Sequence, residues 1–177
     1  MKLKTVIIVL LLGVLVAPVY ASRRDRQMST KTLRSMARAY MAFGKYEKAH
    51  SFASLALQQS RLQETDAGEM ALCLIDMGTV CGYEGLLTQA RRRLEEGVIF
   101  QKKALFDDHP YVAHTLRMLS DIHLRQGDLE QAEAVLSQAV SIMLSHCDLQ
   151  SKEMAPFILE SANLQFEKGN LGQAQDN

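Results

Sequence analysis

The chain has 177 residues, of which 47% are hydrophobic and 23% charged, a content that excludes an intrinsically disordered polypeptide. Basic and acidic residues both number 20, so a formal net charge of zero gives no general attraction to nucleic acid or to an anionic membrane surface. Only 6% of the residues are aromatic and tryptophan is absent. Since alanine, leucine and methionine are abundant, this composition favours helices packed on helices over a β-sheet.

The first predicted element, residues 1–21, has the pattern of an export signal: a basic start, a long apolar run and small or short residues before Ala21. The alternative is a membrane anchor, because residues 5–22 carry no charge and approach a bilayer-spanning length. Three arginines within residues 23–26 favour export, since basic residues prefer the cytoplasmic side. We therefore expect an exported protein, periplasmic or secreted, in which a linker over residues 22–28 follows the signal.

The remainder of the chain, residues 29–177, returns at steps of 41 or 42 residues to a glycine that is followed five residues later by an alanine. The pairs are Gly44 and Ala49, Gly85 and Ala90, Gly127 and Ala132, and Gly169 and Ala174. Apolar side chains before and after each glycine recur at spacings of three and four, which predicts a helix on either side. A glycine readily adopts the positive φ that ends a helix, and an alanine lets two helices approach closely.

The repeat divides the array into units of about 29–66, 67–109, 110–151 and an incomplete 152–177. The junctions between the units read QETD, DDHP and CDLQS, which are typical of polar turns and helix caps. One helical hairpin cannot bury its own apolar face, so successive hairpins are expected to stack side by side. The sequence therefore predicts an all-α solenoid.

The spacing of small and aromatic residues resembles the tetratricopeptide repeat, in the longer form found in kinesin light chains and in many bacterial proteins. The matching residues are Ala37, Tyr40, Gly44, Ala49 and Ala56 in the first unit, and Ser120, His123, Gly127, Ala132 and Ala139 in the third. The chain departs from the pattern at Cys81, His123 and Gln165, where an aromatic is usual, and at Gly97. The resemblance implies a right-handed superhelical solenoid of antiparallel helix hairpins whose first helices line a concave groove.

In this family the exposed positions of the first helices usually bind a peptide. The resemblance carries that role to Lys31, Arg34 and Arg38 in the first unit, Asp76 and Thr79 in the second, His114, Arg117, Asp121 and Arg125 in the third, and Glu160, Asn163 and Glu167 in the fourth. The three basic residues of the first unit share one helix face. They are interpreted either as a solvated face or as a basic groove end that accepts acidic side chains or a C-terminal carboxylate.

Residues that could carry chemistry have simpler structural interpretations. The segment DDHP at 107–110 is expected to cap a helix through Asp107 or Asp108, with Pro110 in the first turn, and not to bind a metal. Cys73 and Cys81 lie eight residues apart on one predicted helix and cannot form a disulfide. The three cysteines, which include Cys147, are expected to be small apolar side chains. Cys81 and His123 occupy equivalent positions and are interpreted as core residues.

The sequence contains no recognised catalytic or phosphate-binding motif, and we expect neither an enzyme nor a cofactor or metal. The predicted function is an exported scaffold that binds a protein or peptide on its concave face, with no partner in nucleic acid. The alternative is an accessory or regulatory segment of an exported enzyme or of envelope assembly machinery. Phe157, Ile158, Leu159, Leu164 and Phe166 make the last unit unusually apolar. This predicts a truncated array, or a partner or second copy that covers this helix.

Overall fold

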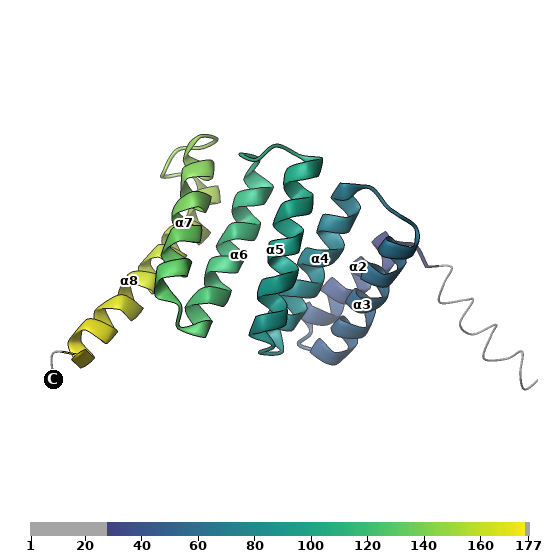
Figure 1. Ribbon diagram of the computed structural model, residues 1–177, viewed down its shortest axis with the longest axis horizontal. Helices are drawn as coiled ribbons and strands as arrows, with labels where there is room; N and C mark the ends of the chain where they lie inside the picture. Colours follow the sequence, from purple (N-terminus) through teal and green to yellow (C-terminus); the bar gives the residue numbers. More distant parts are fainter. Residues whose placement is uncertain (1–27, 176–177) are drawn as a thin grey trace, which may run out of the picture.

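The computed structural model describes residues 28–175, and the side chains of residues 28–169. The predicted signal at 1–21 and nearly all of the linker lie outside the described residues. The elements are α2 (Thr30–Ala42), α3 (Tyr46–Leu62), α4 (Ala67–Tyr83), α5 (Leu87–Ala104), α6 (Pro110–Gln126), α7 (Leu129–Leu144), the short 3-10 helix η1 (Lys152–Met154) and α8 (Ala155–Gln175). They stand side by side in chain order (Figure 1). The described part contains no strand, so the predicted all-α class is confirmed.

Three helical hairpins, α2–α3, α4–α5 and α6–α7, each turn at one of the predicted glycines. Gly44, Gly85 and Gly127 have φ of 67°, 77° and 80°. At the first turn, the N–H of Gly44 donates to the Met41 carbonyl and that of Lys45 to the Tyr40 carbonyl, both at 2.9 Å. The other two turns repeat this pair of bonds, which defines the Schellman motif. The glycine recurs because this motif needs a left-handed residue after each first helix.

The alanines five residues after these glycines are completely buried, as expected for points of closest approach between two helices. Ala49, Ala90 and Ala132 are each 0% exposed. Glycine allows an even closer approach at one position of α4, where a Cβ on Gly78 would lie 2.8 Å from Leu94 Cγ of α5. A larger residue at this position would force the two helices apart.

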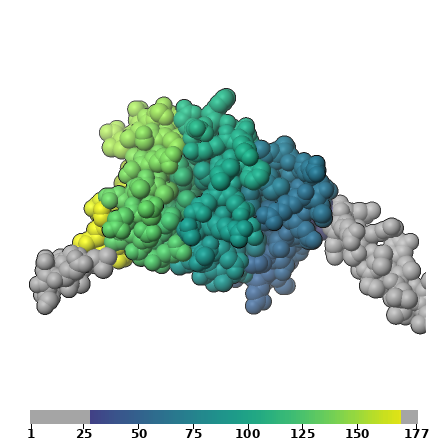
Figure 2. Space-filling view, in the orientation of Figure 1, coloured from purple at the N-terminus to yellow at the C-terminus, as the bar shows by residue number. Residues whose placement is uncertain are grey.

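The hydrophobic core continues from one unit to the next. One cluster of buried side chains joins α2, α3, α4 and α5 and reaches Leu119 and Ile122 of α6. A second cluster joins α6 and α7 to Met154 of η1 and Phe157 of α8. The space-filling view shows the units in contact along the whole array (Figure 2). Each unit therefore gains its buried surface from its neighbours, as in a solenoid.

The first helices of successive units contact one another: α2 contacts α4, α4 contacts α6, and α6 contacts α8. Among the described elements, the second helices α3, α5 and α7 contact the flanking first helices and make no comparable contact with one another. Helices lie closer together on the inner side of a curved stack, so the first helices form the concave face. None of the described helices combines the length and the hydropathy that crossing a membrane requires.

The structure corrects the prediction of a fourth turn at Gly169. This glycine lies within α8, which continues as one helix to Gln175, and Ala174 belongs to the same helix. A glycine permits the turn of a hairpin but does not require it, and a Cβ at Gly169 would meet no atom within 4 Å. No helix of the described part packs back against α8 here, so the α-helix continues.

The apolar residues of α8 divide between its two faces. Phe157 and Leu164 are buried against the array, whereas Ile158, Leu159 and Phe166 are 48%, 64% and 67% exposed. Self-association through this exposed face stays a prediction.

The capping prediction for the segment at 107–110 is correct in kind but wrong in the residue. His109, not Asp107 or Asp108, is the N-cap of α6: its Nδ1 accepts a hydrogen bond of 3.1 Å from the backbone N–H of Tyr111. Pro110 occupies the first turn as expected. An imidazole nitrogen with a free lone pair can satisfy an N-terminal amide as a carboxylate does.

Candidate functional site

A groove of about 260 Å³ lies on the concave face, where α4, α6 and α8 meet. Its lining residues are Gly78, Thr79, Gly82 and Tyr83 of α4, Leu94 of α5, Arg117, Met118, Asp121, Ile122 and Arg125 of α6, and Glu160 of α8. Three consecutive units therefore contribute to one site. Thr79, Arg117, Asp121 and Arg125, which the sequence singled out, all lie in it together with Glu160.

The two glycines of α4 give the groove its depth. Gly78 and Gly82 are four residues apart and so occupy one face of the helix. A Cβ on Gly82 would lie 3.2 Å from Ile122 Cδ1 and 3.7 Å from Arg125 Nη1 of α6. Because Gly82 carries no side chain, α6 approaches α4 closely and its polar residues reach the groove, whereas Gly78 allows the close approach of α5.

Arg125 connects the third unit to the second. Its Nη2 donates a hydrogen bond of 2.8 Å to the Gly82 carbonyl in the last turn of α4. The last carbonyls of a helix have no partner within it and carry partial negative charge, so a guanidinium there is favourable. Arg125 Nη1 also lies 3.7 Å from Asp121 Oδ2 on its own helix. This arginine is thus held in place before any ligand binds.

Arg117 and Glu160 form the least satisfied part of the groove. Arg117 Nη1 lies 3.9 Å from Glu160 Oε2, too far for a good hydrogen bond. Arg117 Nε and Glu160 Oε1 are both buried and have no hydrogen-bond partner among the described residues, and the Glu160 side chain is only 8% exposed. A buried polar group without a partner costs about 1–3 kcal/mol. The groove therefore presents one unpaired donor beside one unpaired acceptor.

The electrostatics of the groove reflect this burial. Desolvation raises the pKa of the Glu160 carboxyl, and the charge of Asp121 raises it further, while Arg117 opposes the shift. A raised carboxyl pKa means that the folded state binds more protons than the unfolded state, so this group lowers stability as the pH rises above the unfolded pKa. Next to the groove, burial and then Arg117 lower the pKa of His114, whose ring packs against Phe157 at 5.2 Å. His114 therefore has a packing role.

The predicted basic end of the groove is corrected by the structure. Arg34 and Asp76, expected to be exposed, are 7% and 4% exposed. Asp76 accepts hydrogen bonds from Arg34 Nε at 2.7 Å and from Arg38 Nε at 2.8 Å. Arg34 Nη1 also lies 3.5 Å from Glu69 Oε1. Two arginines and two carboxylates thus neutralise one another, and they join α2 to α4 instead of forming a basic surface.

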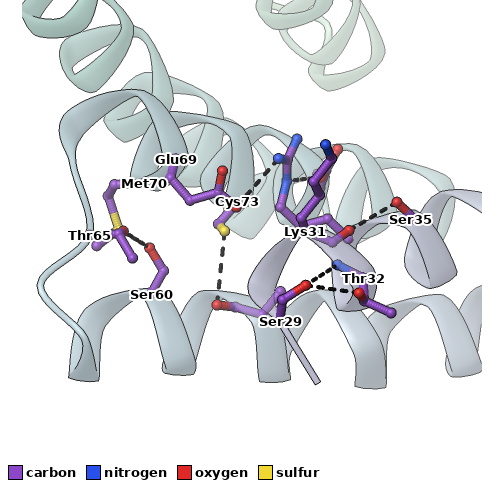
Figure 3. Close-up of polar contacts among 12 residues, drawn as sticks. Ser29, Lys31, Thr32, Ser35, Ser60, Thr65, Glu69, Met70 and Cys73 are labelled. Carbon is purple, nitrogen blue, oxygen red and sulfur yellow. Dashed lines mark hydrogen bonds and ion pairs between the residues drawn. The ribbon is translucent and has the colours of Figure 1, made fainter. Parts of the chain in front are cut away.

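Figure 3 shows the surroundings of this ion cluster. Glu69 extends from α4 towards α2, while Lys31 lies on α2, where its backbone carbonyl accepts a hydrogen bond of 2.9 Å from Ser35 Oγ. Lys31 is exposed, as are Asn163 and Glu167 of α8, and these three residues do not line the groove.

Several lining residues were not selected as binding residues from the sequence. Gly82, Tyr83 and Met118 are examples, because the binding positions that the resemblance carries over do not include them. The signal that could have found them is the spacing Gly78–Gly82, which removes side chains from one face of α4 over a full turn. Such a gap indicates close approach by a neighbouring helix or by a ligand.

Comparisons with known proteins agree with this architecture. Residues 83–145 match the family model of the tetratricopeptide repeat. The structure is similar to a variant form of the nearly identical TPR-like repeats of a candidate kinesin light chain from Podosopora anserina, with 20% identity, a TM-score of 0.70, and coverage of 92% of this chain and 79% of that one. No curated protein matches the sequence significantly.

Two further solved structures have the same fold. The TPR domain of Arabidopsis FLU is 15% identical, with a TM-score of 0.61 over 68% of this chain and 98% of that one. The Yersinia enterocolitica type III secretion translocator chaperone SycD is 18% identical, with a TM-score of 0.58 over 81% of this chain and 90% of that one. The hairpins and the groove define a helical-repeat solenoid. The predicted resemblance is confirmed: residues 83–145 match the tetratricopeptide repeat, and the whole described array has the fold of tetratricopeptide-repeat structures.

Proposed function

We propose that this protein is a scaffold that binds a protein partner through an extended peptide segment in the groove between α4, α6 and α8. The observation that carries the proposal is the unpaired donor, Arg117 Nε, beside the unpaired acceptor, Glu160 Oε1. One residue of an extended peptide directs its own N–H and C=O to the same side of the backbone, which is the complementary pair. Its N–H would donate to Glu160 and its carbonyl would accept from Arg117, so that both buried atoms gain a partner.

The other lining residues are suited to a peptide of mixed composition. Arg117 and Arg125 balance Asp121 and Glu160 in charge, so the groove has no strong preference for a basic or an acidic ligand. Met118 and the exposed ring of Tyr83 offer apolar contact. A flexible thioether beside an aromatic ring accommodates varied apolar side chains. The fold shared with a secretion chaperone and with kinesin light chain repeats is consistent with a protein ligand.

The proposal predicts that both unpaired groups are needed for peptide binding. A peptide selected from a display library against residues 22–177 is measured by calorimetry with Arg117→Met and Glu160→Leu. Each replacement has a similar size and removes one hydrogen-bonding group, so each is expected to weaken binding at least tenfold, about 1.4 kcal/mol. Removal of the Glu160 charge is expected to leave the chain folded, since burial disfavours the carboxylate form of this side chain.

The matched controls are Glu167→Leu, exposed on the same helix α8, and Lys31→Met on α2. Both are expected to bind the peptide as the parent chain does. Equal affinity of the parent chain and of both groove variants would contradict the proposed site.

We further propose that the protein is exported and has no reaction of its own. Support for export comes from the leader pattern of residues 1–21, and support for the second point comes from the lack of any catalytic motif in the sequence. N-terminal sequencing of the chain recovered from the exported fraction is expected to begin at Ser22. A chain that begins at Met1 and stays inside the cell would contradict export.

A further inference from the structure

His50, Cys81 and Glu84 meet at the turn end of the first two units, away from the groove. His50 lies near the start of α3, Cys81 lies in the last turn of α4, and Glu84 is the C-cap of α4. Because α3 runs antiparallel to the first helices, its start lies beside the end of α4. One potential ligand atom from each residue lies within 4.8 Å of the other two, and His50 Nδ1 is 2.6 Å from Glu84 Oε2.

We propose that these three side chains bind a thiophilic divalent cation, Zn²⁺, between the first and second units. Thiolate, imidazole and carboxylate are the protein ligands that Zn²⁺ takes, and three of them leave a fourth position for water. Tetrahedral zinc–ligand bonds of about 2.0–2.3 Å place ligand atoms about 3.3–3.8 Å apart. Small side-chain rotations bring the present arrangement to that geometry.

The cluster is open to solvent on one side. A shallow depression beside it is lined by Tyr46, Glu47, His50, Glu84 and Leu86. The side chains of His50 and Glu84 are 34% and 18% exposed, whereas Cys81 is fully buried beneath them. A cation can therefore enter from solvent at His50 and Glu84, and rotation of these two side chains would open the way to the sulfur.

The alternative is that His50 and Glu84 form only an ion pair between units. Glu133 and Lys168 occupy the equivalent positions at the junction of the third and fourth units, and their charged groups lie 2.6 Å apart. The fourth unit has Gln165 at the position of Cys81 in the second unit. The junction of the third and fourth units therefore contains the polar pair but no thiol beside it. At the junction of the first two units a thiol lies beside the polar pair, and the three side chains form the one three-ligand cluster found among the described residues.

The Cys81 thiol has to lose its proton to bind the cation. Burial raises the pKa of Cys81, and the nearby Glu84 charge raises it further. Binding then forms the sulfur–metal bond, breaks the S–H bond and releases one proton to the buffer. The site shares no residue with the peptide groove, so the failure of one proposal would leave the other unaffected.

The experiment titrates Co²⁺, as a spectroscopic substitute for Zn²⁺, into the reduced chain of residues 22–177. We expect one Co²⁺ per chain, a sulfur-to-cobalt charge-transfer band in the near ultraviolet, visible bands of a tetrahedral ion, and displacement by Zn²⁺. Cys81→Ser is expected to abolish the charge-transfer band. His50→Gln and Glu84→Gln, at partly exposed positions that tolerate substitution, are expected to weaken Co²⁺ binding at least tenfold.

Cys73→Ser and Cys147→Ser are the matched controls, since Cys73 is equally buried on the same helix. Both are expected to keep the band and the affinity. A parent chain without the band, a band that survives in Cys81→Ser, or unchanged affinity in both His50→Gln and Glu84→Gln would overturn the proposal. Should Cys81→Ser fail to fold, the His50 and Glu84 variants decide the outcome.

Discussion

Replacing Asp76 with asparagine is expected to lower the free energy of unfolding by about 3–5 kcal/mol, the usual effect of breaking a buried ion pair. Asp76 is 4% exposed and accepts from both Arg34 and Arg38. Asparagine keeps the size of the side chain but removes its charge. Arg34, itself 7% exposed, would then retain only the longer contact of 3.5 Å with Glu69. Urea unfolding followed by circular dichroism measures the change.

Asp121→Asn is the matched control for this prediction. Asp121 is also an aspartate on a first helix and pairs with an arginine, but it is partly exposed and lies 3.7 Å from Arg125. Exposed pairs of this kind contribute about 0–1 kcal/mol. A loss below about 1 kcal/mol for Asp76→Asn would show that the ion cluster does not stabilise the junction of the first two units.

Phe157→Ala is expected to cost about 3–5 kcal/mol, in the range found for phenylalanine removed from a core. Phe157 is 0% exposed and packs with Val112, Leu116 and Met143 in the cluster that joins α8 to the third unit. The cavity left by the ring lies in the first turn of α8, where this helix packs on the third unit. Hydrogen exchange is therefore expected to show the largest loss of protection in α8, with smaller changes in α2 to α5.

Phe166→Ala on the same helix is the control. Its ring is 67% exposed, so its removal is expected to change stability by less than about 0.5 kcal/mol. Similar effects of the two substitutions, or a uniform loss of protection across the array, would contradict a specific role of Phe157 in docking α8.

The fold was predictable from the sequence to the extent that local constraints decide it. Gly44, Gly85 and Gly127 could be recognised as turns because a left-handed residue is required after each first helix, and the alanines that follow report close helix approach. The same signal failed at Gly169. A glycine permits a turn, but a turn forms only where a further helix has a surface to pack against, and that depends on tertiary structure.

The site was predictable only in part. The repeat register placed Thr79, Arg117, Asp121 and Arg125 on the inner face of the first helices, where they line the groove, and their role in binding stays a prediction. It could not show that Arg34 faces Asp76, since the partner of a charge depends on the stagger between two helices. The proximity of His50 to Cys81 depends on the same stagger. Unpaired atoms such as Glu160 Oε1 follow from side-chain geometry, which no residue pattern contains.

The position of Glu160 on α8 has a consequence for how tightly the scaffold holds its ligands. Among the described elements α8 contacts α7, α6 and η1, and less extensively than the two helices of a central hairpin contact each other, so its detachment costs less than unfolding of those hairpins. The groove is complete only while α8 is docked. Affinity therefore equals the intrinsic affinity of the assembled groove scaled by the docked fraction, and a bound peptide in turn suppresses detachment of α8.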